Sequence, residues 1–277
     1  MSSLKWPFHR EADSPGPSRT GRPVGELHEA EAATTGGTEV GAATSVLGPG
    51  ATESFARLSR ALPDRVALAL VPLGSSRAQV LGGDVPAHGW STTKVPVLVA
   101  LMKARGSRGL AGRERALAHA AITASDNQSI LALFADLKQL KGGLVGASNY
   151  IQSLFRLSGD EQTTVATAPP PAGAVTTFGQ TLWSPAASAK FMSALGRGCL
   201  LPAAAQTSYV LNLMQNIETS ESWGLGSAGF RSVAFKGGWG PERSGGYLVR
   251  QAGIVNVGSS RAVAVAIVAF PSGRASF

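Results

Sequence analysis

The sequence has a single cysteine, only four histidines and no long apolar run. Cys199 alone cannot form an internal disulfide or supply a cysteine-based zinc site. The histidines are dispersed, and no HExxH-type spacing links them. No stretch reaches the roughly 18 apolar residues that a membrane helix needs. These absences predict a protein that uses no metal or cofactor and does not span a membrane.

The first 50 residues differ in composition from the rest of the chain. They are rich in Gly, Ala, Thr, Pro and Glu and show no apolar periodicity, so no burial offsets the entropy of ordering them. They also lack the apolar segment of a signal peptide. We therefore predict a disordered tail over residues 1–50 and a folded domain over 51–277. The sequence as written predicts a cytoplasmic location, and a different translation start would allow a secreted or periplasmic one.

The charge is concentrated in the predicted domain. The chain carries +8 overall, but the first 50 residues hold four Lys and Arg against six Asp and Glu. Residues 51–277 therefore hold 21 basic against 11 acidic side chains, which is near +10. Most arginines stand singly, and no basic stripe with interleaved aromatic residues occurs. The positive balance suits an anionic substrate or surface, and the absence of a basic stripe argues against nucleic-acid binding. We expect the partner to be a small-molecule substrate.

Apolar patterning indicates strands at both ends of the domain and helices between them. Valine- and alanine-rich strands are predicted at 66–73, 77–81, 230–236, 247–257 and 261–270. Helices are predicted at 53–62, 91–103, 116–124, 128–137 and 184–195, the last capped by Ser184. The simplest architecture is an α/β (α+β) fold. Its antiparallel sheet comes from about 51–90 and 205–277, and an all-α lobe, about 91–204, is inserted between them.

One Ser-x-x-Lys motif opens a predicted apolar helix. Ser91-Thr92-Thr93-Lys94 places Ser91 and Lys94 on one helix face, near the positive end of the helix dipole. A serine hydroxyl needs a base to become nucleophilic. An amine one turn away can serve if burial and a second cation lower its pKa. The alternative interpretation is a helix N-cap followed by a solvated lysine.

Two further motifs follow in order. Ser125-Asp126-Asn127 begins 34 residues after Ser91, and Lys236-Gly237-Gly238-Trp239 begins 109 residues after Asn127, on a predicted strand. Over about residues 51–277 the set resembles the S-x-x-K, S-D-N and K-T-G motifs of class A serine β-lactamases and penicillin-binding proteins. The gap from Ser91 to Ser125 is shorter than class A enzymes usually have.

The resemblance implies a role for each motif residue. Ser91 would be the acylated nucleophile, and Lys94 would be the base that helps activate it. Ser125 would relay a proton to the leaving nitrogen, and Asn127 would hold the substrate's side-chain amide. Lys236 would face the substrate carboxylate and help keep Lys94 neutral.

The resemblance also places the third motif along the substrate. The backbone N–H groups of Ser91 and Trp239 would form the oxyanion hole, with Gly237 and Gly238 as substrate-binding positions. In the family a Thr or Ser stands where this chain has Gly237, and its hydroxyl binds the substrate carboxylate. Arg250 on the next strand could supply a guanidinium instead. A solvated strand arginine is the alternative.

The class A family activates water for deacylation with a glutamate. Aligning residues 157–165 with the family's Gly-Asp-x-x-Thr-Arg-Leu stretch places that glutamate near Pro169, inside Pro169-Pro170-Pro171, where no acid stands. Glu161 lies 34 residues past Asn127, a spacing at which the family carries its glutamate, but the Glu-x-x-Leu-Asn pattern is absent. Glu161 is therefore a candidate deacylation base, with a surface loop carboxylate as the default interpretation.

The sequence thus predicts a serine hydrolase that forms an acyl-enzyme through Ser91 with a β-lactam or a related amide or ester. Deacylation is predicted to be slow. One alternative is a D-amino-acid peptidase or esterase of the D-Ala-D-Ala carboxypeptidase kind. The other is a non-catalytic ligand-binding domain, although a pure binder has no need of an activated nucleophile.

Overall fold

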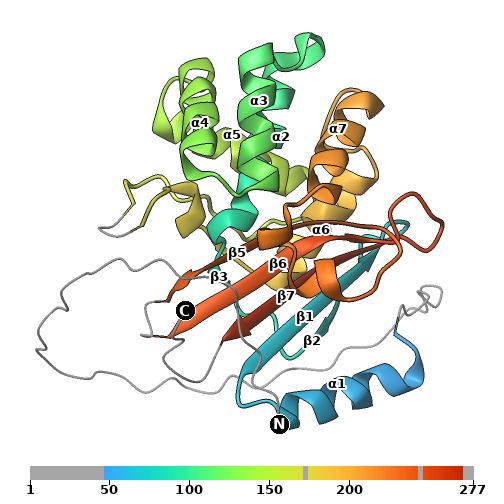
Figure 1. The fold of residues 1–277 in the computed structure, drawn as a ribbon. Helices are drawn as coiled ribbons and strands as arrows, with labels where there is room; N and C mark the ends of the chain where they lie inside the picture. Colours follow the sequence, from blue (N-terminus) through green and yellow to red (C-terminus); the bar gives the residue numbers. More distant parts are fainter. Residues whose placement is uncertain (1–46, 171–173, 243–245, 271–277) are drawn as a thin grey trace, which may run out of the picture. The chain divides into compact units, whose positions relative to one another are not determined.

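A five-stranded antiparallel sheet is the base of the fold (Figure 1). The computed structural model describes residues 47–170, 174–242 and 246–270, so most of the predicted tail and Pro171 lie outside the described residues. The sheet has the order β2-β1-β7-β6-β5. Its strands are β1 (Arg65–Pro72), β2 (Gln79–Leu81), β5 (Val233–Pro241), β6 (Tyr247–Val255) and β7 (Val263–Phe270). Segments from both ends of the domain therefore pair in one sheet, as the sequence predicted.

Strand β6 lies between β5 and β7, and every residue after Tyr247 in it is buried. The register with β5 pairs Gly237 with Gln251 and Gly238 with Arg250. Residues paired across two strands point to the same face of the sheet, and neighbours along a strand point to opposite faces. The Gly237–Gln251 pair and the Gly238–Arg250 pair therefore lie on opposite faces. This register decides which side chains can approach the third motif.

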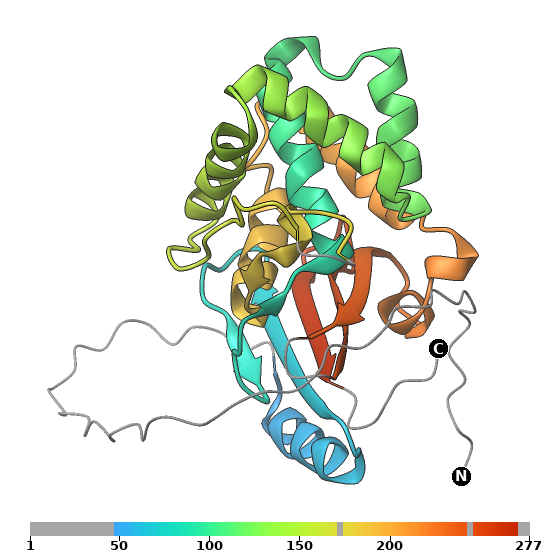
Figure 2. The same ribbon diagram turned by 90° about the vertical axis from the view of Figure 1, so that its left-hand side faces the viewer.

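The helices form a layer on one side of the sheet. Helix α6 (Pro185–Gly196) packs on β1, β6 and β7, and its predicted N-cap is confirmed because Ser184 accepts a hydrogen bond from the backbone N–H of Ala187. The remaining helices of the layer are α2 (Lys94–Arg105), α3 (Gly112–Thr123), α4 (Asn127–Lys141), α5 (Leu144–Leu157) and α7 (Ala204–Gln215). Helix α1 (Pro49–Ala61) lies beside β1 and β2, at the end of the domain away from these helices (Figures 1 and 2).

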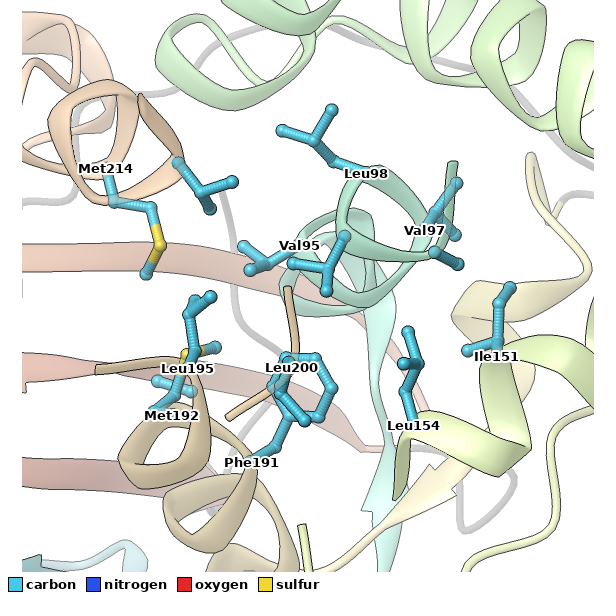
Figure 3. Close-up of a cluster of buried hydrophobic side chains, with 14 of the residues drawn as sticks. Val95, Val97, Leu98, Ile151, Leu154, Phe191, Met192, Leu195, Leu200 and Met214 are labelled. Carbon is cyan, nitrogen blue, oxygen red and sulfur yellow. The ribbon is translucent and has the colours of Figure 1, made fainter. Parts of the chain in front are cut away.

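Helix α2 is the centre of the helical layer. All its residues from Lys94 to Met102 are buried, which is typical of a helix that is apolar all round. Figure 3 shows its side chains among those of α5, α6, α7 and the segment after α6: Val95, Val97, Leu98, Ile151, Leu154, Phe191, Met192, Leu195, Leu200 and Met214. Each fully buried aliphatic side chain contributes about 1.5–3 kcal/mol. This packing fixes the N-terminal end of α2, where the Ser-x-x-Lys motif lies.

The structure differs from the predicted elements in several places. The predicted helix 91–103 begins as a 3₁₀ turn, η1 (Trp90–Thr93), and becomes α-helical at Lys94. Helices α5 and α7 were not predicted. Neither was the small sheet of β3 (Ala87–His88) and β4 (Leu182–Trp183). Short 3₁₀ turns connect other elements: η2 (Gly106–Arg108), η3 (Phe178–Gln180), η4 (Thr219–Glu221) and η5 (Gly224–Ser227).

Candidate active site

Ser91 lies in the turn η1, where the backbone is strained. The preceding Trp90 has φ 44°, a conformation that bulky residues rarely adopt. The Thr93 hydroxyl donates to the Trp90 carbonyl oxygen at 2.6 Å, and Gly240 leaves room for the Trp90 ring because a Cβ there would overlap it. Such strain persists where the surroundings over-determine it, and it is enriched at functional sites. The turn presents the half-buried Ser91 at the start of α2.

The second motif forms the connection from α3 to α4. Ser125 has φ 57°, so it too is held in the left-handed region. Asp126 caps α4 by accepting a hydrogen bond from the Ser129 backbone N–H at 2.6 Å, and the hydrogen bonds with Ser129 lower the pKa of the Asp126 carboxyl. Asn127 is the first residue of α4 and is half-buried. The cap therefore fixes the position of Ser125.

Two buried lysines converge on Ser125. Lys94 Nζ lies 3.2 Å from Ser125 Oγ and also donates to the Ser125 carbonyl oxygen. Lys236 Nζ donates to Ser125 Oγ at 2.8 Å and to the Gly237 carbonyl oxygen at 3.2 Å. Lys94 is 1% exposed and Lys236 is fully buried. The structure thus brings together residues from all three predicted motifs.

Glu221 is a member of this cluster that the sequence analysis missed. It ends the turn η4, is buried, and its Oε2 lies 3.7 Å from Lys236 Nζ. It belongs to none of the three motifs. The one feature of the sequence that could have suggested Glu221 is its position, 15 residues before Lys236 and between the last helical segment and the strand that carries the third motif. The site therefore contains two lysines and one carboxylate.

Burial controls the protonation of the cluster. Burial first, and then the positive charge of Lys236, lower the pKa of Lys94 from 10.5 to about 7. Burial also lowers the pKa of Lys236 to about 8, although the Glu221 carboxylate opposes this shift. Burial raises the pKa of Glu221, and the two lysines oppose that shift. Near neutral pH, Lys94 is the member of the pair that loses its proton more readily.

Strand β5 lies directly against the turn that carries Ser91. A Cβ added at Gly238 would lie 2.8 Å from the backbone nitrogen of Ser91 and 3.0 Å from that of Thr92. Only a glycine permits this approach without a shift of one backbone relative to the other. Trp239, whose backbone N–H was predicted to face the substrate, is the next residue of the strand.

Several solved structures are similar to this chain in fold. TLA-3 extended-spectrum β-lactamase matches with a TM-score of 0.63 at 15% identity, covering 80% of this chain and 90% of that one. A β-lactamase from Chitinophaga pinensis matches at 0.61 and 19% identity, covering 78% and 88%. One from Streptosporangium roseum matches at 0.61 and 16% identity, covering 82% and 91%. The fold is that of the class A β-lactamases. No protein-family model and no curated protein sequence matches the chain.

Within this β-lactamase fold, the structure contradicts the predicted role of Arg250. The side chain is 1% exposed, and its guanidinium donates to the carbonyl oxygens of Ala87, His88 and Trp183 at 3.1–3.2 Å and to Ser188 Oγ at 2.7 Å. It therefore binds β3, β4 and α6 to the sheet. It is neither a substrate ligand nor the solvated strand arginine considered as the alternative.

The structure also separates Glu161 from the cluster. Its side chain is 75% exposed, and its Oε2 lies 3.7 Å from Nε of Arg156. It lines a hollow with Asp84 and Lys190, and none of the other predicted site residues lines that hollow. Glu161 is thus a surface loop carboxylate, which was the default interpretation.

Gly237 stands where the K-T-G motif has a threonine, and it packs against the ring of Trp223. The sequence analysis did not single out Trp223. A Cβ at Gly237 would lie 2.7 Å from the Trp223 ring, and the Trp223 and Trp239 rings meet edge to face with centroids 6.2 Å apart. A threonine could not occupy this position without displacing Trp223. The glycine is therefore explained by packing.

The described residues contain neither a candidate metal site nor a candidate membrane-spanning helix. Across residues 47–170, 174–242 and 246–270, no group of three or more His, Cys, Asp or Glu side chains is placed to hold a metal ion. Within the same residues, no helix combines the length and apolar character needed to cross a membrane.

Proposed function

We propose that the chain is a serine acyl-transfer hydrolase of the β-lactamase type and that Ser91 is its nucleophile. The observation that carries this proposal is the Ser125 hydroxyl, which lies 3.2 Å and 2.8 Å from the ammonium nitrogens of the buried Lys94 and Lys236. Burying two cationic side chains is costly unless they are paired or lose a proton. A proton-transfer role accounts for that arrangement, whereas a binding pocket would not require it.

Acylation begins when neutral Lys94 accepts the proton of Ser91 as Oγ attacks the substrate carbonyl carbon. The carbonyl electron pair moves to oxygen, and the resulting oxyanion is held by the backbone N–H groups of Ser91 and Trp239. Each such donor typically contributes about 3 kcal/mol. When the intermediate collapses, the bond to the leaving nitrogen or oxygen breaks. Ser125 gives its proton to the leaving atom and regains one from the Lys94 ammonium.

Substrate contacts follow from the same placement. The backbone of Gly237 and Gly238, on the part of β5 that meets the turn η1, would lie along the acyl group. Asn127, two residues past Ser125, would offer its side-chain amide to the substrate's amide. Both contacts position the carbonyl for attack, and misplacement by about 1 Å can cost about 10²-fold in rate.

Deacylation would be slow. Water needs a positioned base, which commonly contributes about 10² to 10⁴ in rate. The one acid predicted for that role, Glu161, is exposed and paired with Arg156. Pro169 and Pro170, at the aligned position of the family's glutamate, carry no titratable group. The acyl-enzyme should therefore accumulate.

Covalent labelling tests the proposal. Wild type, Ser91→Ala and the exposed control Ser76→Ala would be incubated with a fluorophosphonate and, separately, with an uncharged chromogenic ester, then analysed by intact mass. Wild type and Ser76→Ala should each gain one equivalent of label, and Ser91→Ala none. Stoichiometric labelling of folded Ser91→Ala would overturn the nucleophile assignment. Absence of label from wild type with every probe would favour the ligand-binding alternative.

A further inference from the structure

We propose that this site acylates uncharged esters or amides, those with no carboxylate beside the scissile carbonyl, because Glu221 neutralises Lys236 inside the site. The inference rests on the proposed acyl-transfer function and specifies its substrate class. It is carried by the contacts of Lys236, by the charge of the cluster and by the packing around Gly237.

Lys236 is already engaged by three partners. An ammonium has three N–H donors. Two of them go to Ser125 Oγ at 2.8 Å and to the Gly237 carbonyl oxygen at 3.2 Å, and Glu221 Oε2 forms an ion pair with the ammonium at 3.7 Å. The lysine is fully buried, and the Glu221 side chain is 10% exposed. A substrate carboxylate would have to compete with the Glu221 carboxylate for this ammonium.

The charge of the cluster also disfavours an anion. In the form that acylates, Lys94 is neutral, so Lys236 and Glu221 are the charged pair and their sum is zero. An anion brought within hydrogen-bonding distance of Lys236 would also come close to the Glu221 carboxylate. Like charges brought together without water are strongly unfavourable. Arg250 cannot compensate, since its guanidinium is bound to β3, β4 and α6.

Gly237, which follows Lys236 in β5, is covered by an indole that is held in place. Gln251, the β6 partner of Gly237, is buried; its Nε2 donates to the Trp223 carbonyl oxygen at 2.7 Å, and its Oε1 accepts from the Leu225 N–H at 2.7 Å. These two bonds hold the Trp223 ring against Gly237, next to Lys236 in the chain. A threonine hydroxyl, the family's carboxylate ligand at this position, therefore has no room here unless Trp223 is displaced.

Two thioesters with one acyl group test the inference. Benzoylglycyl thioglycolate carries a carboxylate in its leaving group, and its methyl ester is neutral; thiol release gives kcat/KM for both. Wild type should prefer the neutral ester by about tenfold or more. Glu221→Gln, which removes the carboxylate at nearly constant volume, should lower that preference by about tenfold. Glu218→Gln, an exposed carboxylate three residues away, is the matched control and should keep the wild-type ratio.

The outcomes separate this inference from the proposed function. Equal or faster hydrolysis of the anionic thioester by wild type overturns the inference, as does an unchanged ratio in Glu221→Gln. If Glu221→Gln does not fold, Glu221→Ala serves as the second charge-removing variant, with the same expectation. Wild type that neither hydrolyses a thioester nor takes up fluorophosphonate overturns the function and the inference together. Uptake of fluorophosphonate without charge preference overturns the inference alone.

Discussion

The rate of acylation should follow the deprotonation of Lys94. Burial and the neighbouring Lys236 lower the pKa of Lys94 to about 7, so about half of the molecules hold the neutral amine at pH 7. An ordinary lysine with a pKa of about 10.4 would be neutral in fewer than one molecule in a thousand. The cluster therefore increases the active fraction by about 10³-fold. Because the neutral form is the base, the rate should rise about tenfold per pH unit below the pKa of Lys94 and level off above it.

Two substitutions should move this profile in opposite directions. The positive charge of Lys236 lowers the pKa of Lys94, so Lys236→Met should shift the midpoint to higher pH. It should also lower the plateau, since the hydrogen bond to Ser125 is lost. The negative charge of Glu221 raises the pKa of Lys94, so Glu221→Gln should shift the midpoint to lower pH. A merely structural cluster would not produce shifts of opposite sign.

The assay is single-turnover acylation by the methyl ester of benzoylglycyl thioglycolate at saturating concentration, followed by thiol release from pH 5 to 9, so that binding does not limit the rate. Circular dichroism at each pH confirms that each variant remains folded. A rate that stays constant across this range in wild type would remove Lys94 as the base. Shifts of the same sign in both variants would show that the electrostatic coupling described here is wrong.

Three further predictions follow from the contacts around the site. Gly238→Ala should slow acylation about tenfold or more, since its Cβ would lie 2.8 Å from the Ser91 backbone nitrogen; Gly74→Ala, in open space, should not, as measured by labelling rate. Arg250→Met should lower the free energy of unfolding by about 3 kcal/mol or more in urea titrations, because three buried carbonyl groups lose their donor. In stopped-flow traces, wild type and Glu161→Gln should both show a burst of about one equivalent and the same slow turnover. A turnover lost in Glu161→Gln would identify Glu161 as the deacylation base.

The outline of the fold was predictable because the strands and α2 carry their patterns locally. Strands β1, β6 and β7 are rich in Val, Ala, Leu and Ile, and α2 is apolar all round. Helices α5 and α7 were missed although each has buried positions on one face. Their sequences mix Gly, Ser, Thr and Asn with the apolar residues, so local propensity is weak. Tertiary packing stabilises both helices. Helix α5 packs against α2, α4 and α6, and α7 packs against α2, α3 and β5.

The motif residues and their neighbours were predictable to very different degrees. Ser91, Lys94, Ser125 and Lys236 follow from short patterns, and the fold brings their elements together. Glu221 completes the same cluster but belongs to no sequence pattern. Its contribution depends on its contact with Lys236, 15 residues later, and only the path of the chain before β5 determines that contact.

Arg250 shows the reverse error. An arginine on a strand next to a candidate site has the chemistry of an anion receptor. Whether it serves as one depends on which face of the sheet it occupies and on what already binds it. Here the register pairs it with Gly238, and three carbonyl oxygens and a serine hydroxyl bind its guanidinium in the interior. Gly237, on the other face, is covered by Trp223 instead of carrying a hydroxyl. One residue of register thus separates Arg250, whose guanidinium is bound in the interior, from the position opposite Gly237, where Trp223 packs. The roles of these two positions depend on which face of the sheet each occupies, so they could not be inferred from residue types alone.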